Sequence, residues 1–572
     1  MKDAVPTAQN SFWPRALPPQ IPVPEGSLWL NLEISARRYP NKPAYVFFGK
    51  PMSYGQLHAQ AMQLSRNLRA RGFEKGDRFC LYMQNSPAFA LIFYAVLRLG
   101  GVVVPVNPMC KAEELAYFVK DSGSKLVFCA ADLLPIARQA QQDSAQAGHA
   151  LELVGCSYAS FMAARDELAE DERPSAEVYD WLHARPQQEL ADLQLVDMIG
   201  EGLQAGPDPE EAVADDLALI AYTSGTTGFP KGCMHTHRSL MGNAILGYWN
   251  NTTAGVISLA SVPMFHITGL LYYVLVNVFI GTTTLLINRW DKRLASGLIK
   301  KYGVTHWTCI PTMVADIMGD DSYKDFGFQQ LRYLSGGGTG MPKALADRLL
   351  DEFGLDFVEG YGLTETVAST HVNPPQRPKH QCLGIPISGV TSLVMDQDSQ
   401  QPLGANEIGE IVIDSPTVFK GYWNKPQDYE DSFVSIGGRR FFKTGDIGYF
   451  DEEGYFFLTD RSKRMINSSG FKVWPTEVES LFYKNEKIKE VCVIAIKDAY
   501  RGESAKAIIV LKPSARGTTT AEEVRDWARG HMAAYKVPKH IEFTEALPKS
   551  GSGKILWRQL QEAANPEDTP AD

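Results

Sequence analysis

The chain has 572 residues, of which 44% are hydrophobic and 21% are charged, and its formal net charge is −10. This length is too great for one simple core, and the composition is ordinary for a folded globular protein, which excludes intrinsic disorder. The acidic balance disfavours a general nucleic-acid binder, which usually presents a basic face. We therefore expect several packed layers or domains and no nucleic-acid partner.

The cysteines and the N-terminus indicate the cellular compartment. Eight cysteines are scattered along the chain without a Cys-x-x-Cys pair, a pattern typical of reduced thiols in a cytosolic protein of this size. The N-terminal segment lacks a basic region followed by an apolar one, so it does not resemble a signal peptide. These features predict a cytoplasmic protein.

Two apolar stretches are long enough to suggest membrane spans. Residues 88–106 contain Arg98 and several turn residues, and residues 270–287 are interrupted by Asn277 and Gly281. Each stretch is more typical of a buried helix, a glycine turn and a buried strand. We therefore predict no transmembrane segment and leave peripheral membrane contact open.

Most of the chain alternates helical periodicity with short apolar strands. The expected elements, in chain order, are a strand over 215–222, a helix from Asp291 to Lys301, a strand over 304–310, a helix from Pro342 to Gly354, and a strand at 357–358 that leads into a glycine-containing loop. Proline suits the first turn of a helix and glycine its C-terminal cap. This alternation predicts an α/β fold with substantial parallel sheet.

Two segments depart from this pattern. Residues 130–214 are rich in Ala, Gln, Asp and Glu, which predicts a helical, partly flexible surface insertion. After Asp460, strand-like runs over 491–496, 507–511 and 541–543 interleave with helical patterns over 475–483 and 520–533. We therefore expect a large N-terminal domain over 1–460 and a small α+β domain over 464–572.

The strongest chemical signal is the run from Tyr222 to Gly232. It contains the hydroxyls of Thr223, Ser224, Thr226 and Thr227, the glycines Gly225 and Gly228, and then Lys231. Glycines let a backbone approach phosphate oxygens, hydroxyls and amides donate hydrogen bonds, and lysine adds a positive charge. The run follows an apolar strand, which disfavours a linker, and Pro230 before Lys231 excludes a Walker loop. It therefore predicts a phosphate-binding loop.

Four further motifs follow in order. They are Ser-Gly-Gly-Gly at 335–338, Glu-Gly-Tyr-Gly-Leu-Thr-Glu at 359–365, Lys-Thr-Gly-Asp at 443–446 with Asp-Arg-Ser-Lys at 460–463, and Pro-Lys-Ser-Gly-Ser-Gly-Lys at 548–554. With the phosphate loop, the chain resembles the acyl-adenylate-forming superfamily from about residue 25 to residue 560. That superfamily includes acyl-CoA synthetases, aryl-CoA ligases, luciferases and carrier-loading adenylation domains. The resemblance implies a large domain of layered α/β subdomains and a small mobile C-terminal domain.

The implied chemistry explains the residue types. A carboxylate is a poor electrophile, but its attack on the α-phosphorus of ATP forms an acyl-AMP and releases pyrophosphate. A thiol such as that of coenzyme A can then displace AMP. Because negative charge builds on phosphate oxygens, cations and fixed hydrogen-bond donors must meet it there. The resemblance therefore implies ATP and coenzyme A as substrates and Mg²⁺ as cofactor.

The resemblance also assigns roles to residues. The ATP- and AMP-binding set comprises Thr223, Ser224, Gly225, Thr226, Thr227, Gly228, Lys231, Gly336, Gly337, Gly338, Glu359, Gly360, Tyr361, Gly362, Asp446 and Arg461. Within it, the loop from Thr223 to Lys231 should hold the β- and γ-phosphates and Tyr361 should stack on the base. Asp446 should accept hydrogen bonds from the ribose.

The implied catalytic set comprises Lys554, Glu365, Thr364 and His266. Glu365 should hold Mg²⁺, a hard cation suited to carboxylate and phosphate oxygens, and Lys554 should stabilise the adenylation transition state from the small domain. The hinge matches 461–463 at Lys463, and Gly470 with Phe471 matches the coenzyme A tunnel. Structural roles are favoured over zinc for the pair His235 and His237, since no third ligand is evident.

The substrate is the open question. The run at 335–342, whose small residues would leave room for an acyl tunnel, is similar to that of bacterial medium- and long-chain fatty acyl-CoA synthetases. Thr339-Gly340 departs from that pattern and leaves aryl and alicyclic acids as alternatives. A ligase that loads a carrier protein, a luciferase-like oxygenase and a nucleotide-binding regulatory protein without catalysis are further alternatives. A homodimer is a family-level expectation only.

Overall fold

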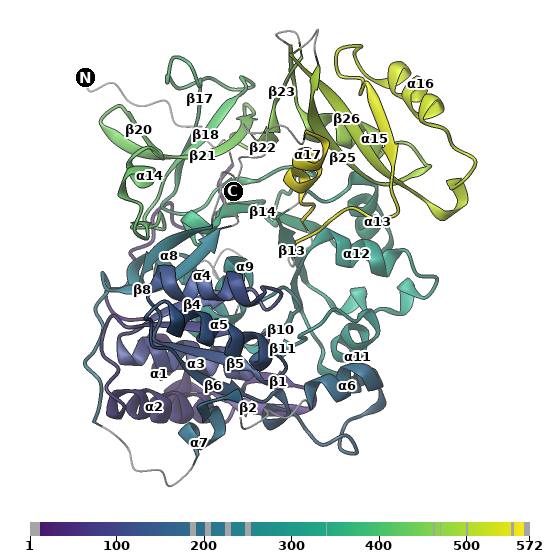
Figure 1. Cartoon of the computed structure of the whole chain (residues 1–572). Coiled ribbons are helices and arrows are strands. Elements are labelled where there is room, and N and C mark those ends of the chain that lie inside the picture. Colours follow the sequence, from purple (N-terminus) through teal and green to yellow (C-terminus); the bar gives the residue numbers. More distant parts are fainter. Residues whose placement is uncertain are drawn as a thin grey trace. The chain divides into compact units, whose positions relative to one another are not determined.

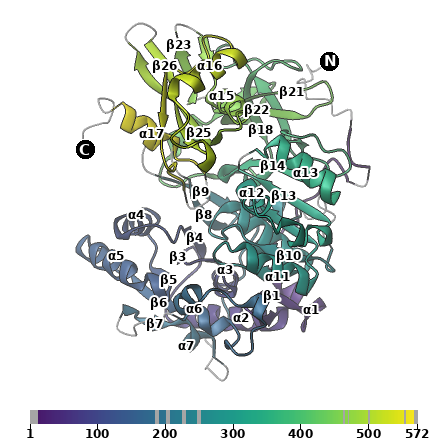
Figure 2. The same ribbon diagram turned by 90° about the vertical axis from the view of Figure 1, so that its right-hand side faces the viewer.

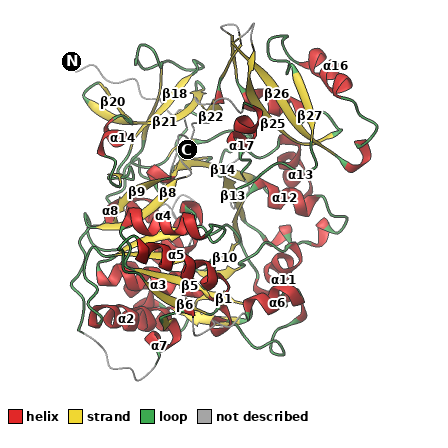
Figure 3. Cartoon of the chain, viewed as in Figure 1, coloured by secondary structure: helices red, strands yellow, loops and turns green. Residues whose placement is uncertain are grey.

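The computed structural model describes residues 12–15, 17–183, 190–200, 207–223, 230–245, 253–338, 340–461, 464–468, 471–498, 502–550 and 554–565. The chain divides into two compact units. The larger comprises Trp13–Thr391 and Asp414–Phe433, and the smaller includes Ser392–Ile413 and Val434–Asp572. Figure 1 follows the chain through both units, and Figure 3 shows that both mix helices with strands, which confirms the predicted α/β class. The predicted division at residue 460 stays a prediction.

One sheet of the larger unit carries most of the glycine motifs. Its strand order is β16-β15-β14-β13-β12-β10-β11-β1-β2. The strands are β1 (Pro43–Phe47), β2 (Lys50–Ser53), β10 (Ile257–Ala260), β11 (Thr283–Leu286), β12 (His306–Cys309), β13 (Tyr333–Gly337), β14 (Phe357–Leu363), β15 (Ala368–Val372) and β16 (Ile385–Pro386). The run from β1 through β14 is parallel, as predicted, and β2, β15 and β16 add antiparallel edges.

A second sheet in this unit carries the phosphate-loop motif. Its strand order is β19-β9-β8-β4-β3-β5-β6-β7. The strands are β3 (Arg78–Tyr82), β4 (Val102–Val106), β5 (Leu126–Ala130), β6 (Glu152–Cys156), β7 (Leu193–Gln194), β8 (Leu217–Thr223), β9 (Lys231–Thr236) and β19 (Gly421–Tyr422). Strands β8 and β9 form an antiparallel hairpin, and β19 pairs antiparallel with β9. The motif therefore lies at the antiparallel end of a largely parallel sheet.

The helices of the larger unit include some that begin or end next to a residue with a clear capping role. The helices are α1 (Trp29–Arg38), α2 (Tyr54–Ala70), α3 (Pro87–Leu99), α4 (Ala112–Ser122), α5 (Leu134–Gln146), α6 (Ala176–Leu182), α7 (Leu195–Ile199), α8 (His237–Ala244), α9 (Ile267–Gly269), α10 (Asn277–Ile280), α11 (Lys292–Tyr302), α12 (Pro311–Met318), α13 (Lys343–Phe353) and α14 (Pro426–Glu430). The Asp291 carboxylate accepts from the first amides of α11, and Gly354 ends α13 in the left-handed conformation. Both boundaries were predicted. Helices α4 and α5 pack side by side (Figure 2).

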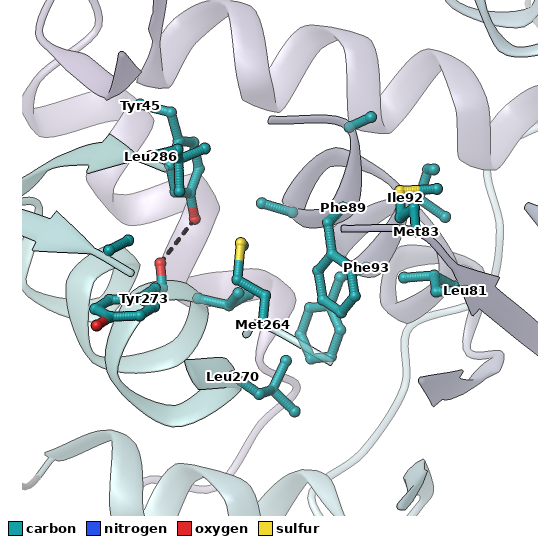
Figure 4. Close-up of a cluster of buried hydrophobic side chains, with 14 of the residues drawn as sticks. Tyr45, Leu81, Met83, Phe89, Ile92, Phe93, Met264, Leu270, Tyr273 and Leu286 are labelled. Atoms are coloured by element: carbon teal, nitrogen blue, oxygen red, sulfur yellow. Dashed lines mark hydrogen bonds between the residues drawn. The ribbon is translucent and has the colours of Figure 1, made fainter. Parts of the chain in front are cut away.

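Both apolar stretches have the predicted form. In the first, the buried helix α3 ends at the left-handed Gly100 and leads into the fully buried β4. In the second, a π-helical stretch, Leu270–Val276, and α10 lead through Gly281 into β11. Figure 4 shows their side chains in one core, where the Tyr45 hydroxyl donates a hydrogen bond to the Tyr273 carbonyl at 3.0 Å. Across the described residues, no helix is both long and apolar enough to cross a membrane.

The segment 130–214 differs from the prediction of a helical surface insertion. Its described part contributes β6 and β7 to the second sheet as well as α5, α6 and α7. Leu153, Phe161 and Leu182 belong to the main hydrophobic core. The short buried stretches were not predicted from the polar composition, because their apolar residues are few and widely separated in the sequence. The segment is therefore part of the core structure and is helical only in part.

The smaller unit contains two further sheets. One has the order β17-β18-β21-β20 with β22 beside β21, and the other has the order β24-β23-β26-β25 with β27 beside β26. The elements are β17 (Thr391–Met395), β18 (Gly409–Asp414), β20 (Phe433–Ile436), β21 (Arg439–Phe450), β22 (Phe456–Arg461), β23 (Ile466–Ser468), β24 (Phe471–Val473), α15 (Pro475–Phe482), β25 (Ile488–Asp498), β26 (Gly502–Leu511), α16 (Ala521–His531), β27 (His540–Phe543) and α17 (Trp557–Ala564). The strands and helices predicted after residue 474 are confirmed, and α17 was not predicted.

Candidate active site

The described flanks of the phosphate-loop motif form the hairpin of β8 and β9, in which Thr223 lies opposite Lys231. Residues 224–229, which include Ser224, Gly225, Thr226, Thr227 and Gly228, lie outside the described residues. The Lys231 ammonium pairs with the Asp428 carboxylate at 2.7 Å and lies 5.2 Å from the centre of the Tyr422 ring. A cation therefore lies at the end of this hairpin, held between a carboxylate and an aromatic face.

The Tyr422 ring that faces Lys231 also contacts the predicted metal ligand. Its hydroxyl donates a hydrogen bond to Oε1 of Glu365 at 2.9 Å. Burial, together with the charge of the Glu365 carboxylate, holds the pKa of Tyr422 far above its usual range, so the hydroxyl keeps its proton. The backbone N–H of Phe419 donates to the Glu365 carbonyl at 2.8 Å. One segment, residues 419–422, therefore holds both the side chain and the backbone of Glu365.

The turn Thr364–Ala368, which follows β14, is anchored by buried side chains. The Nε2 atom of His235 lies 2.8 Å from the Thr364 carbonyl oxygen and must carry the proton to donate to it. Burial lowers the pKa of His235 to about 4, so its imidazole is neutral at physiological pH. The Asn243 amide donates to the carbonyls of Thr366 and Val367 at 2.8 and 2.6 Å.

The backbone of this turn adopts a conformation that is rare for residues other than glycine. Val367 and Ala368 have φ values of 55° and 64°, in the left-handed region, where a non-glycine residue in such a strained conformation costs about 1–3 kcal/mol. Such a conformation persists only where the surroundings enforce it. The Asn243 amide meets this requirement, because it also reaches the Ser369 carbonyl at 3.2 Å. The anchors therefore fix the position of Thr364 and Glu365.

Close backbone packing accounts for three glycines of the two central motifs. A Cβ atom would lie 2.2 Å from the Cys309 carbonyl oxygen at Gly336, 2.4 Å from that of Gly360 at Gly337, and 1.4 Å from that of Ala368 at Gly362. These separations are far below any ordinary contact, so no side chain fits. The strand β14 moreover continues through Gly360 and Gly362 to Leu363, where a loop was predicted. The acyl tunnel inferred from small residues stays a prediction.

Glu359 and Tyr361 are buried and contact other parts of the protein. The Glu359 oxygens accept hydrogen bonds from the amides of Met341 and Cys382 at 2.7 and 3.1 Å, and the residue is 7% exposed. Burial raises the pKa of Glu359, and these backbone hydrogen bonds offset part of the effect. Tyr361 packs its ring against His371, with 5.5 Å between the ring centres. Glu359 therefore braces two loops around β14.

The histidines named from the sequence have local partners. In His266, which is half-buried, the Nδ1 atom accepts from the Thr268 amide at 3.3 Å and caps the turn that leads into Leu270. In His237, Nδ1 accepts from the Leu28 amide at 3.1 Å. These contacts, with that of His235, give the His-x-His pair structural partners.

Asp446 and Lys554 lie in the smaller unit. Asp446 is 1% exposed, lies on β21 and faces Arg461 of β22 in the strand register. The side chains of Arg461 and Phe471 lie outside the described set, as do residues Lys463 and Gly470. Lys554 is exposed, and its N–H and carbonyl form a reciprocal pair with Ser550 at 3.2 and 2.8 Å.

Comparison with known proteins decides the family. Residues 32–423 match the AMP-binding enzyme family, and residues 477–554 match the AMP-binding enzyme C-terminal domain. The chain belongs to the AMP-binding enzymes. It is 31% identical to a long-chain-fatty-acid–CoA ligase of Bacillus subtilis over 96% of this chain and 97% of that one. It is also 31% identical to a feruloyl-CoA synthase of an Amycolatopsis species, over 92% and 96% of the two chains.

A solved structure with bound ATP is similar to this chain in fold. ATP-bound MatB from Rhodopseudomonas palustris superposes with a TM-score of 0.79 at 28% identity, over 93% of this chain and 99% of that one. The family resemblance inferred from five motifs is therefore confirmed. This AMP-binding enzyme is an AMP-forming acyl-CoA synthetase with ATP and coenzyme A as substrates and Mg²⁺ as cofactor, as predicted.

The described residues of this AMP-binding enzyme fit a magnesium ion bound together with a nucleotide. No group of three or more His, Cys, Asp or Glu side chains among them could form a protein-only metal cage. Mg²⁺ is usually held by one or two carboxylates together with substrate phosphates and water. Glu365, half-buried and oriented by the Tyr422 hydroxyl, supplies one such carboxylate.

Sequence reasoning did not identify the residues that anchor the Glu365 turn. Tyr422, His235 and Asn243 lie 57, 129 and 123 residues away from their partners in the chain. His235 was noted only as part of a His-x-His pair. No local pattern distinguishes these residues, because their partners are backbone carbonyls or a side chain in a distant motif.

Proposed function

We propose that this acyl-CoA synthetase activates an apolar carboxylic acid, of the fatty-acid class, as an acyl-adenylate and transfers the acyl group to coenzyme A. In the first half-reaction a carboxylate oxygen attacks the α-phosphorus of ATP and pyrophosphate leaves. In the second the coenzyme A thiol loses its proton, its sulfur bonds to the acyl carbon, and AMP leaves.

One observation carries the proposal. The Lys231 ammonium and the Glu365 carboxylate both contact the side chain of Tyr422, so a cation lies over the face of the ring and the proposed metal-binding carboxylate lies at its hydroxyl. A triphosphate bound with a divalent cation requires both kinds of group. This arrangement favours a nucleoside triphosphate over a neutral ligand at this place.

In this proposal the larger unit binds the polyphosphate. Lys231 would leave Asp428 to pair with phosphate oxygens, and Glu365 would hold the metal, which would supply positive charge that offsets the charge of the phosphates. Thr364 donates a hydrogen bond toward the α-phosphate, and His266 lies near the acyl carboxylate. The smaller unit supplies Asp446 for the ribose and Lys554 for the transition state.

The acid class rests on the relatives. The Bacillus subtilis relative is named a long-chain-fatty-acid–CoA ligase, which supports a fatty acid. The feruloyl-CoA synthase of equal identity favours an aryl acid as the second candidate. A homodimer and a cytoplasmic location are further proposals. A carrier protein as acyl acceptor is the alternative to coenzyme A that the assay below tests.

Pyrophosphate release tests the function directly. The full chain would be assayed with ATP and Mg²⁺ over a panel from acetate to long-chain fatty acids, with aryl and alicyclic acids, each with and without coenzyme A. Mass spectrometry would identify the product. We expect a fatty acyl-CoA. A feruloyl or other aryl product would move the substrate to the second candidate, and pyrophosphate release without any acyl-CoA would indicate a carrier protein.

A domain rotation about Lys463 is the remaining proposal for the second half-reaction. Replacing Lys463 with proline would restrict φ at that position. We expect Lys463→Pro to keep acyl-AMP formation and to impair transfer to coenzyme A. Equal loss of both half-reactions in single-turnover assays would contradict a hinge there.

A further inference from the structure

The geometry points to Tyr422 as a positioning residue of the adenylation site, which orients the Glu365 carboxylate for Mg²⁺ and supports Lys231 for the phosphates. This inference rests on the proposed roles of Glu365 and Lys231. Tyr422 belongs to none of the motifs from which those roles were derived, and it acts through both side chains without a chemical step of its own.

The strand register explains why one side chain can reach both groups. Tyr422 on β19 lies directly opposite Cys233 on β9. Residues two apart on a strand share a face, and directly opposed residues of an antiparallel pair share that face as well. Lys231, Cys233 and His235 therefore lie on the same face as Tyr422. On this face Lys231 meets the Tyr422 ring, and His235 meets the carbonyl of Thr364.

The Tyr422 hydroxyl is the part that meets Glu365. The 2.9 Å hydrogen bond to Oε1 occupies one lone pair of that oxygen and restricts rotation of the carboxylate. The ring is itself held by Phe419, with 4.6 Å between ring centres, and the Phe419 amide holds the Glu365 backbone. A glutamate whose backbone and carboxylate are both held in place loses less conformational freedom when it binds a cation.

The ring of Tyr422 has a second, separable role. Its face lies 5.2 Å from the Lys231 ammonium, which is also paired with Asp428. A phenylalanine would keep this face and remove only the hydroxyl, whereas a leucine would remove both. The two substitutions therefore separate the effect on Glu365 from the effect on Lys231.

Calorimetric titration of the full chain with ATP tests the inference, with Mg²⁺ or with EDTA in the cell. The readout is the affinity for ATP with Mg²⁺ divided by the affinity for ATP in EDTA. This ratio isolates the contribution of the metal. We expect Tyr422→Phe to lower this ratio about tenfold, the size of a hydrogen bond to a charged group, and to leave the affinity in EDTA unchanged. Tyr422→Leu should also weaken binding in EDTA, because Lys231 loses its aromatic support.

Three further proteins complete the design. Glu365→Gln should abolish the metal-dependent gain, and the double variant Tyr422→Phe with Glu365→Gln should lose no more than Glu365→Gln alone, since the hydroxyl acts through that carboxylate. Tyr429→Phe removes a hydroxyl from a ring that also packs on Phe419 and is the matched control. Thermal unfolding of each protein monitors the fold.

The outcomes are distinguishable. A normal ratio in Tyr422→Phe, beside a lost ratio in Glu365→Gln, would overturn the role of Tyr422 and leave that of Glu365 intact. A normal ratio in both variants would overturn the metal-binding role of Glu365 and, with it, this inference. Additive losses in the double variant would also overturn it, because the hydroxyl would then act through another group.

Discussion

The Glu365 turn in the larger unit and the Lys554 loop in the smaller unit are both predicted to act in adenylation, yet they are held in different ways. Buried side chains from β9 and α8, together with the Phe419 amide, hold four consecutive carbonyls from Thr364 to Val367. The exposed Lys554 forms a reciprocal pair of hydrogen bonds with the nearby Ser550, one through its backbone N–H and one through its carbonyl. The proposed metal ligand thus has buried anchors, while the described contact of the proposed catalytic lysine is with a residue four positions away in the chain.

This difference has a physical basis. Hydrogen bonds to fully buried groups are costly to lose, because the partner left behind cannot find water. They can therefore enforce the left-handed conformations of Val367 and Ala368. A loop at the surface has water as an alternative partner, so its conformations differ less in free energy. The comparison predicts that changes in the turn reduce stability, and that changes in the loop reduce catalysis alone.

The largest expected effect concerns Lys554. Removing a cation that meets transition-state charge typically costs about 10²–10³ in rate, so Lys554→Ala should slow acyl-AMP formation by that factor. Transfer from preformed acyl-AMP and the unfolding temperature should change little. The matched control is Lys549→Ala, which removes a neighbouring lysine that pairs with Glu490 at 2.9 Å. Near-normal pyrophosphate release by Lys554→Ala would contradict the assignment.

The next largest effect lies in the turn. In Gly362→Ala the new Cβ would lie 1.4 Å from the Ala368 carbonyl oxygen, so the strands must move apart, and we expect a loss of about 3 kcal/mol or more in the free energy of unfolding. Gly530→Ala is the control, because nothing lies near its added Cβ and it lies in α16, where alanine stabilises a helix. Denaturant titration of both variants compares them. A Gly362→Ala protein of normal stability would show that β14 and β15 can move apart at no cost in free energy.

The same comparison shows what the sequence could predict. Lys231, Glu365 and Lys554 belong to runs in which charged residues follow glycines and hydroxyls, and such runs predict a site without any knowledge of packing. The glycine motifs also carried information about packing. Gly336 and Gly362 allow neighbouring backbone to approach closely, in addition to the ligand contacts predicted for these motifs. Sequence alone could not separate these two causes.

The anchors of the site could not be predicted, because they depend on strand register. Tyr422 reaches Glu365 only because β19 pairs with β9 at Cys233, and a two-residue strand leaves almost no sequence signal. For a similar reason β6 and β7 were missed in the polar segment 130–214, whereas the long apolar runs of α3 and β4 were predicted correctly.

A smaller effect follows from three buried histidines of the larger unit. Burial lowers the pKa of His235 and His237 to about 4 and that of His371 to about 3. In the unfolded chain these histidines take up protons near pH 6.5, whereas in the folded chain they do so only near pH 4 or below. Their contribution to the free energy of unfolding is therefore fully present above about pH 6.5 and is lost as the pH drops toward 4. Each histidine contributes a slope of up to about 1.4 kcal/mol per pH unit in that window.

Denaturant titrations between pH 7 and pH 4 would measure the histidine contribution. We expect His371→Gln to show a shallower loss of stability than the unmodified chain, because one of the sites that take up a proton on unfolding is gone. His540→Gln, a change at an exposed position of the smaller unit, should follow the unmodified chain. Parallel curves for His371→Gln and the unmodified chain would assign the acid sensitivity to other groups.

The smallest effects give the sharpest test of the contrast, because they delete one hydroxyl from each region. The Thr366 hydroxyl is buried, accepts from the Leu363 amide at 3.1 Å and lies 3.0 Å from the Ala368 carbonyl oxygen. Thr366→Val leaves these groups unpaired, which should cost about 1–3 kcal/mol of stability. Ser550→Ala removes the hydroxyl that accepts from the Lys554 amide at the surface, and we expect a stability change within about 0.5 kcal/mol but slower acyl-AMP formation. If Ser550→Ala were the more destabilising of the two, or if it left adenylation unchanged while Thr366→Val reduced it at temperatures where the protein stays folded, the division between an anchored turn and a locally held catalytic loop would be wrong.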